Sequence, residues 1–141
     1  MVGLLVWLKV ELNLQIEKYL NIPYLPDGCD FDGTDCYGII RLIYRNELSC
    51  SLPPFASSTE DSLINQLVEQ NICLTETLQN PEPYCIVTFR ENNLVSHMGM
   101  VLNDTRYFIH NSAKRQRSTR ERLDHPYWSQ HIGNFLRWKM H

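Results

Sequence analysis

The hydrophobic positions follow a helical spacing in the first half of the chain and a strand spacing in the second half. Apolar side chains of residues 11–20 recur at intervals near 3.6 and predict an amphipathic helix. Residues 36–48 are apolar on most faces, which predicts a buried, central helix, and residues 62–71 predict a further amphipathic helix. The apolar residues 1–10 fit either a strand or the lead-in to the first helix.

Runs rich in β-branched and aromatic residues begin at Tyr84, and they predict strands. The predicted strands are 84–89, 94–102, 106–110 and 117–123. Asn103-Asp104 predicts a hairpin turn between the second and third of them. The aromatic-rich tail, residues 125–138, is expected to pack back on the sheet. Helices followed by strands predict an α+β fold with an antiparallel sheet, formed as one domain over residues 1–141.

A polar segment leads into the central helix. Residues 25–34 contain proline, glycine and acidic side chains, which predicts a loop. Thr34 or Asp35 can then cap the helix, because a side-chain oxygen there accepts hydrogen bonds from backbone N–H groups of the first turn. Cys36 follows at the positive end of the helix dipole, which favours thiolate over thiol. Gly38 weakens the helix, so a close approach of another backbone is expected there.

The composition is that of a folded domain, with 43% hydrophobic and 21% charged residues, and it argues against disorder. A net charge of −3 is too small to indicate a partner. Basic residues gather between Lys114 and Arg122, where Glu121 is the one acid. Contact with nucleic acid is one interpretation of this run. A solvated strand or loop is favoured, because no aromatic residue interleaves the basic ones.

The cysteines are five, with no C-x-x-C pair. An odd number without paired spacing argues against a disulfide framework and against a cysteine-rich zinc site. The apolar stretch from Val2 to Leu8 lacks a basic leader and is too short to be a signal peptide or a membrane span. We therefore expect synthesis in the cytoplasm, free thiols and no membrane insertion.

Two histidines could serve the thiol of Cys36. A cysteine nucleophile needs a base and a third group that orients the base. His97 lies in the predicted strand 94–102, and His110 ends the next strand at a similar distance from the turn, so the two imidazoles are expected to touch. A cysteine at a helix start facing two histidines on a sheet is the papain-like arrangement. A zinc site formed by the same three residues is an alternative, but the helix start suits thiolate activation without metal, and we expect no metal and no cofactor.

Four strings around these residues resemble one family, the NlpC-type cell-wall cysteine peptidases, whose usual motifs are close to PY, DCSG, HVGI and FIHA. The strings are Pro23-Tyr24, Asp35-Cys36-Tyr37-Gly38, Ser96-His97-Met98-Gly99 and Phe108-Ile109-His110-Asn111-Ser112. The family has a papain-like fold and cuts peptidoglycan stem peptides. The resemblance implies that Cys36 is the nucleophile, His97 the general base and His110 the residue that orients His97.

The resemblance also implies a substrate cleft. Tyr24 and Asp35 match family positions that line the cleft and bind the free amino end of the stem peptide, and Tyr37 and Ser96 stand beside the catalytic positions as further substrate-binding residues. Two departures bear on specificity. Leu25-Pro26-Asp27-Gly28 stands where the family has a glycine pair, and Tyr37 replaces the usual small residue.

Further strings fit the bacteriophage tail branch of the family, namely Leu52-Pro53 and the late series Arg122-Leu123, Trp128 and Arg137. This resemblance implies an endopeptidase of the γ-D-glutamyl-diamino acid bond, carried by a phage tail, with stem peptides and other tail proteins as partners and no nucleic acid. Two alternatives stay open. One is a structural protein of the tail tip that retains the fold, and the other is an acyltransferase or amidase acting on another substrate.

Overall fold

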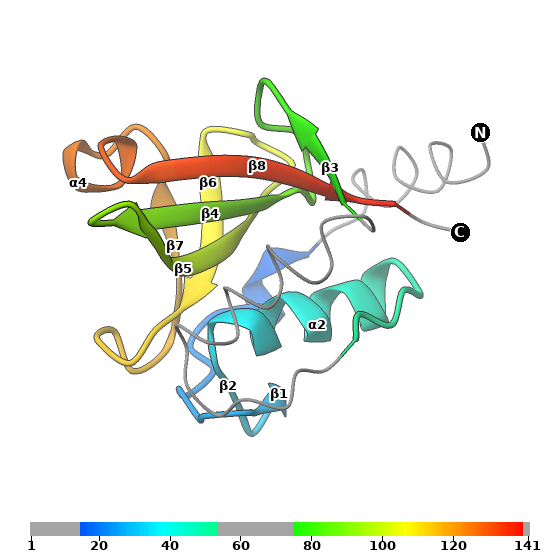
Figure 1. The fold of residues 1–141 in the computed structure, drawn as a ribbon. Coiled ribbons are helices and arrows are strands. Elements are labelled where there is room, and N and C mark those ends of the chain that lie inside the picture. The colour runs from blue at the N-terminus through cyan, green and yellow to red at the C-terminus, as the bar shows by residue number, and fades with distance from the viewer. Residues whose placement is uncertain (1–14, 54–74, 140–141) are drawn as a thin grey trace.

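A computed structural model of the protein describes residues 15–53 and 75–139, and a six-stranded antiparallel sheet dominates it (Figure 1). The strand order is β3-β8-β4-β5-β6-β7. The strands are β3 (Thr75–Leu78), β4 (Ile86–Glu91), β5 (Leu94–Val101), β6 (Tyr107–Asn111), β7 (Ser118–Arg122) and β8 (Ile132–Trp138). The predicted elements over residues 1–10 and 62–71 lie outside the described residues, as does Cys73.

The four predicted strands are confirmed with ends shifted by one or two residues, and the turn at residues 103–104 joins β5 to β6. The sequence did not predict β3. The tail does more than pack on the sheet, because β8 forms its second strand, between β3 and β4. Arg137 on β8 reinforces this position through ion pairs with Glu76 on β3 and with Glu82, each at 2.9 Å.

The predicted central helix is α2 (Cys36–Glu47), which contacts β5 and β6 and lies along one side of the sheet in Figure 1. Its apolar side chains share one buried cluster with Met98 and Met100 of β5 and Ile109 of β6. Successive side chains on a strand point to opposite faces, so the neighbours of these three residues face away from α2. That second face is covered by a smaller apolar cluster, which contains Phe89, Phe108 and Trp128.

Two predictions in the first 35 residues were wrong in part. The described end of the predicted first helix is a short 3-10 helix, η1 (Ile16–Tyr19), in which the backbone N–H of Leu20 donates to Glu17 three residues back. The predicted loop over residues 25–34 contains a small hairpin of β1 (Cys29–Asp30) and β2 (Gly33–Thr34). The side chain of Asp30 accepts from the backbone N–H of Asp32 and so stabilises the tight turn between them.

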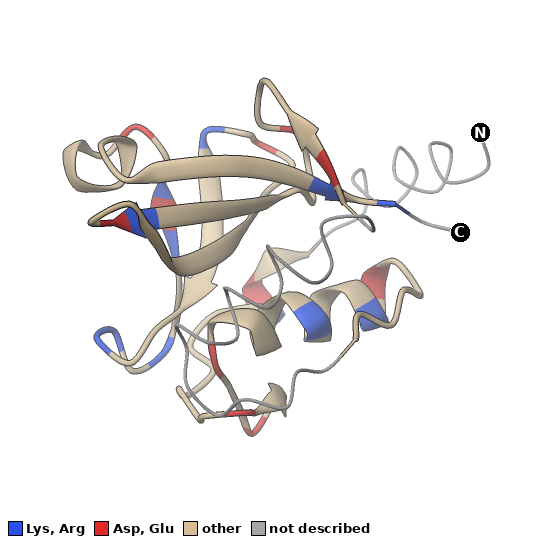
Figure 2. Ribbon diagram, viewed as in Figure 1, with Lys and Arg blue, Asp and Glu red and all other residues tan. Residues whose placement is uncertain are grey.

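Arginines of the basic run 114–122 pair with carboxylates, and the described cysteines are free thiols. Figure 2 marks the β6–β7 loop as basic, and Arg115 in it pairs with Glu121 at 3.0 Å while Arg122 pairs with Asp124 at 2.8 Å. None of the four described cysteines forms a disulfide. No helix among the described residues is long and apolar enough to cross a membrane.

Candidate functional site

The start of α2 is held by Asp35. Its carboxylate accepts from the backbone N–H of Gly38 at 2.7 Å, which caps the helix as one of the two predicted residues, and from the N–H of Asp27 at 3.0 Å. The close backbone approach expected at Gly38 is confirmed. A Cβ there would lie 1.8 Å from the carbonyl oxygen of Gly28, so no other residue fits without moving the loop. Cys36, the first residue of α2, is completely buried.

A buried amide ties this helix start to the end of β6. Asn111 donates from Nδ2 to the carbonyl oxygen of Thr34 at 3.1 Å, to the Thr34 hydroxyl at 2.9 Å, and to the carbonyl oxygen of Ile22 at 3.0 Å. Thr34 precedes Cys36 by two residues, and Asn111 follows His110 directly. These hydrogen bonds therefore couple the turn that carries Cys36 to the strand that carries His110. The approach of Cys36 to His97 itself stays a prediction.

The predicted contact between the two imidazoles is confirmed. Nε2 of His97 lies 2.8 Å from Nδ1 of His110. The strand register, in which Met100 pairs with Ile109, places Gly99 opposite His110, so the two histidines meet diagonally. A Cβ at Gly99 would come within 3.2 Å of the His110 Cβ, so a glycine leaves the room that His110 occupies.

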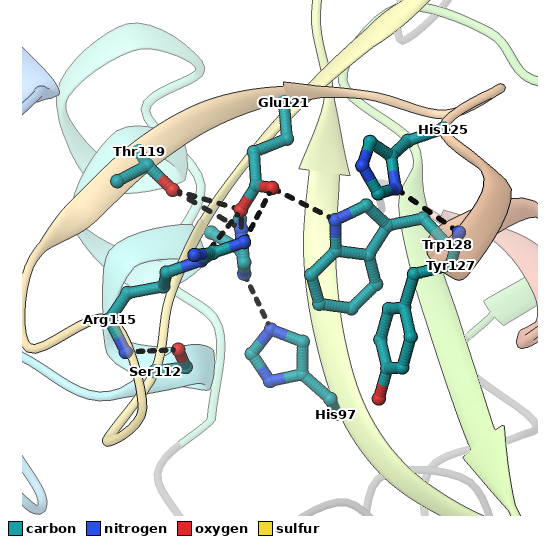
Figure 3. A network of polar contacts seen from close by, with 9 residues as sticks. His97, Ser112, Arg115, Thr119, Glu121, His125, Tyr127 and Trp128 are labelled. Carbon is teal, nitrogen blue, oxygen red and sulfur yellow. Dashed lines mark hydrogen bonds and ion pairs between the residues drawn. The ribbon is translucent and has the colours of Figure 1, made fainter.

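Glu121 on β7 extends this contact into a chain of three residues (Figure 3). Its Oε2 lies 2.5 Å from Nε2 of His110, and its Oε1 accepts from the indole N–H of Trp128 and from the guanidinium of Arg115, each at 3.0 Å. The Thr119 hydroxyl lies 3.3 Å from both His110 and Glu121. Trp128 packs against both imidazole rings, with ring centroids 5.9 Å from His97 and 5.0 Å from His110.

Burial and charge set the protonation of this chain. Burial lowers the pKa of His110 from 6.5 to about 4, even though its hydrogen bond with Glu121 acts in the opposite direction. Burial alone would raise the pKa of Glu121, but hydrogen bonds from His110 and Trp128 outweigh it, and the pKa falls to about 2. Near neutral pH the pair is therefore a neutral imidazole and a carboxylate.

A cavity of about 430 Å³ opens beside His97. Phe89, Tyr127 and Trp128 give it an aromatic lining. Its polar lining comes from Ser96, Ser112, Lys114, Arg115, His125 and His131, together with Glu91. A cavity that combines aromatic side chains with many polar and charged groups suits a polar ligand such as a peptide.

The predicted substrate-binding residues lie in different environments. Ser96 lines this cavity next to His97. Tyr24 is half-buried, and its backbone bridges to Thr34. Asp35 is buried, with both carboxylate oxygens accepting from backbone N–H groups. Tyr37 is 2% exposed and donates its hydroxyl proton to the carbonyl oxygen of Pro53 at 2.7 Å, a placement that favours a packing role.

Glu121 was not predicted as a site residue, because in the sequence it stands only as the one acid in a basic run. The hairpin of β6 and β7 pairs Phe108 with Glu121 and His110 with Thr119. Side chains at alternate positions share a face, so Thr119 and Glu121 lie on the His110 face of the sheet. The alternation of inward and outward side chains along Ser118–Arg122 was the available signal. It could place Glu121 beside His110 only with the register between β6 and β7, which the sequence alone did not specify.

The zinc alternative finds no support in the geometry. No group of three or more His, Cys, Asp or Glu side chains in the described ranges is arranged to hold a metal ion. His110 also engages both ring nitrogens, with His97 on one side and Glu121 on the other, so neither is available as a ligand.

Comparison of the sequence with models of known protein families assigns the chain to one of them. Residues 21–137 match the NlpC/P60 family, and this range contains Cys36, His97, His110 and Glu121. The chain belongs to the NlpC/P60 family. A search of the curated proteins gives no match.

Solved structures share the fold of this NlpC/P60 domain. A lipoprotein-like NLP/P60 family protein of Staphylococcus aureus has a TM-score of 0.62 at 19% identity, over 99% of this chain and 42% of that one. The NlpC/p60 domain of the peptidoglycan hydrolase SagA has a TM-score of 0.61 at 12% identity, over 96% and 97% of the two chains. The P60 domain of antigen MAP1204 from M. avium subspecies paratuberculosis has a TM-score of 0.57 at 14% identity, over 100% and 99%. The chain thus spans less than half of the staphylococcal protein and nearly all of the two isolated domains.

Proposed function

We propose that this chain is a cysteine peptidase that hydrolyses an amide bond in peptidoglycan stem peptides. The observation that carries the proposal is the contact between His97 and His110, which lie on two strands packed against the helix that Cys36 begins. A base held by an orienting group beside a cysteine at a helix start is the constellation that thiol hydrolysis needs. The naming of SagA as a peptidoglycan hydrolase supports the choice of substrate.

We propose that residues 1–141 form one domain and that Cys36, His97 and His110 act in it as a papain-like catalytic triad. The thiolate of Cys36 attacks the scissile carbonyl carbon, and the backbone N–H of Cys36 with a neighbouring donor stabilises the oxyanion. The thioester forms as the C–N bond breaks, and His97 gives its proton to the leaving amine. Water then attacks the thioester, His97 accepts a proton from it, and the acid product leaves as the thiol is restored.

The bond we propose is the one between γ-D-glutamate and the diamino acid. The cavity beside His97 and Ser96 would receive one side of this bond. Tyr24 and Asp35 would bind the free amino end of the peptide. No cofactor or metal takes part in these steps.

We further propose that the chain is made in a bacterial cytoplasm and acts on the cell wall as part of a phage tail, with other tail proteins as partners. The strings Leu52-Pro53 and Arg122-Leu123 with Trp128 and Arg137 support this setting. Mass spectrometry of purified particles tests it. Peptides of this chain in tail fractions are expected, and their absence from particles whose host cell makes the chain would contradict it.

Digestion of purified muropeptides, followed by mass spectrometry of the products, tests the activity. Wild type and a Cys29→Ser control should both release L-Ala-γ-D-Glu, while Cys36→Ala should release none. Equal product from Cys36→Ala would exclude the mechanism. Products with a transferred acyl group would instead indicate an acyltransferase, and a folded wild type that yields no product would favour a structural tail protein.

A further inference from the structure

Glu121 is the outermost member of the chain of contacts that starts at His97. Its carboxylate is largely buried, with 17% of the side chain exposed, and His110 is completely buried. Water does not reach His110, so its hydrogen bond with Glu121 has no competitor from solvent on the imidazole side, and the protonation of the two groups determines its direction.

The directions follow from one carboxylate. Glu121 is ionised near neutral pH and can only accept, so His110 must present an N–H at Nε2, 2.5 Å from Oε2. The opposite tautomer would bring the Nε2 lone pair against a carboxylate oxygen. A neutral His110 protonated at Nε2 has its lone pair at Nδ1, and His97 must therefore donate from its own Nε2, 2.8 Å away.

We propose that Glu121 is a positioning residue that acts through His110 to determine which nitrogen of His97 carries the proton. The neutral His97 ring is then protonated at Nε2, and Nδ1 is its proton-accepting atom. The tautomer rests on the contacts and on the protonation of Glu121 and His110, whereas its consequence for turnover rests on the proposed function.

The carboxylate is itself held in orientation. Oε1 accepts from the indole N–H of Trp128 and from Nη2 of Arg115, each at 3.0 Å (Figure 3). Oε2 faces His110 and also accepts from Nε of Arg115, at the longer distance of 3.3 Å. The indole also covers the pair of imidazoles, since its ring lies 5.0 Å from that of His110. Exclusion of water strengthens each hydrogen bond of the chain and favours a single tautomer.

This arrangement would stabilise the protonated form of His97 during catalysis and keep the proton on that ring. Proton transfer from the thiol of Cys36 to Nδ1 makes His97 a cation, and the carboxylate of Glu121, two hydrogen bonds away, stabilises that charge. His110 does not take the proton in its place, because burial keeps its imidazole neutral. The positive charge thus remains at the ring that returns the proton to the leaving amine.

Glu121→Gln separates this role from a merely structural one. Two donors at 3.0 Å, the indole of Trp128 and Nη2 of Arg115, favour the amide oxygen at the Oε1 position over the single 3.3 Å contact of Arg115 Nε at Oε2. The amide N–H₂ would then face Nε2 of His110 and require it to accept. The tautomers of both histidines should then reverse. In serine proteases, Asp→Asn at the carboxylate bonded directly to the catalytic histidine lowers kcat about 10⁴-fold. Because the imidazole of His110 lies between Glu121 and His97, we expect a smaller loss of kcat, on the order of 10²-fold, with little change in KM.

Long-range ¹H–¹⁵N NMR of histidine-labelled protein measures the tautomers without any need for activity. In wild type at pH 7, His97 and His110 should both carry a proton at Nε2. A proton at Nδ1 of His110, or a His97 ring without a proton at Nε2, would overturn the proposal. In Glu121→Gln the proton of His110 should move to Nδ1, and kcat should fall.

Two controls make each outcome decisive. Glu76→Gln removes an exposed carboxylate on β3 and should change neither the tautomers nor kcat. Thr119→Val removes the nearby hydroxyl and should leave both histidines protonated at Nε2. Unchanged tautomers and turnover in a folded Glu121→Gln would overturn the role of Glu121. The predicted tautomers in a wild type that does not turn over would overturn the proposed function and leave the tautomer assignment standing.

Discussion

Nε2 of His97 lies 2.8 Å from Nδ1 of His110, although Gly99 rather than His97 stands opposite His110 in the strand register. The imidazoles reach each other along the diagonal of the strand pair, over the space that the missing side chain of Gly99 leaves. Glu121 on the neighbouring strand β7 contacts the other ring nitrogen of His110, and His110 in turn contacts His97. These contacts orient both imidazole rings.

His110→Asn should preserve part of the activity that His110→Leu loses. An asparagine can accept from His97 through its carbonyl oxygen and donate to Glu121 through its amide, so it keeps both hydrogen-bond directions. We expect a loss in kcat within about 10-fold for Asn and on the order of 10²-fold or more for Leu. Steady-state kinetics on a stem peptide would show the difference, and equal loss in both variants would contradict the orienting role.

Protonation of His110 should couple to folding. Its pKa is about 4 in the folded state against 6.5 when exposed, so the unfolded chain binds a proton that the folded one does not between these values. The free energy of unfolding should therefore fall as the pH drops from 6.5 to 4, by up to about 3 kcal/mol.

Urea titrations across this pH window measure the effect. His110→Asn should flatten the slope, since it removes the group that titrates. The same slope in wild type and His110→Asn would show that another group is responsible.

Asp35→Asn distinguishes the two roles assigned to this residue. The carboxylate caps α2 through Gly38 and holds the loop through Asp27, and an amide oxygen can still accept one of these hydrogen bonds. Asp35→Ala should lower the free energy of unfolding by about 1–2 kcal/mol, and Asp35→Asn by less. If Asp35 also binds the amino end of the substrate, Asp35→Asn should raise KM, and an unchanged KM would leave it a helix cap only.

Asn111→Ala should weaken the attachment of the Cys36 turn to β6. It removes a buried donor that serves Thr34 and Ile22, and the acceptors left behind lose their partner. We expect a loss of about 1–3 kcal/mol in thermal or urea unfolding, together with reduced kcat. Full activity in a folded Asn111→Ala would show that this tether does not position the nucleophile.

Local chemistry explains what the sequence could predict. The apolar run after Cys36, the capping residue before it and the glycine at its third position specify α2, because each acts within one or two turns. The strands around residues 103–104 were predictable for the same reason. Counting outward from that turn brought His97 and His110 together, but it placed them directly opposite each other, whereas the register makes their contact diagonal. The four resemblance strings lie within the family match at residues 21–137.

Long-range pairing explains what the sequence could not predict. β3 and β8 pair across more than fifty residues, and nothing in either segment specifies the partner. The small hairpin of β1 and β2 depends on an Asx turn at Asp30 that also fits a loop. Glu121 was missed because its partner, His110, is fixed by the register of β6 and β7 rather than by sequence spacing.

A covalent intermediate on Cys36 tests the central claim most directly. Wild type mixed with a stem peptide, quenched in acid within the first turnover and digested should give a thioester adduct of the acyl fragment on the peptide that contains Cys36. Cys36→Ala should give no adduct and no product. Product release by Cys36→Ala would contradict the assignment of Cys36 as the nucleophile. So would an adduct on another cysteine that forms in the Cys36→Ala variant as it does in wild type.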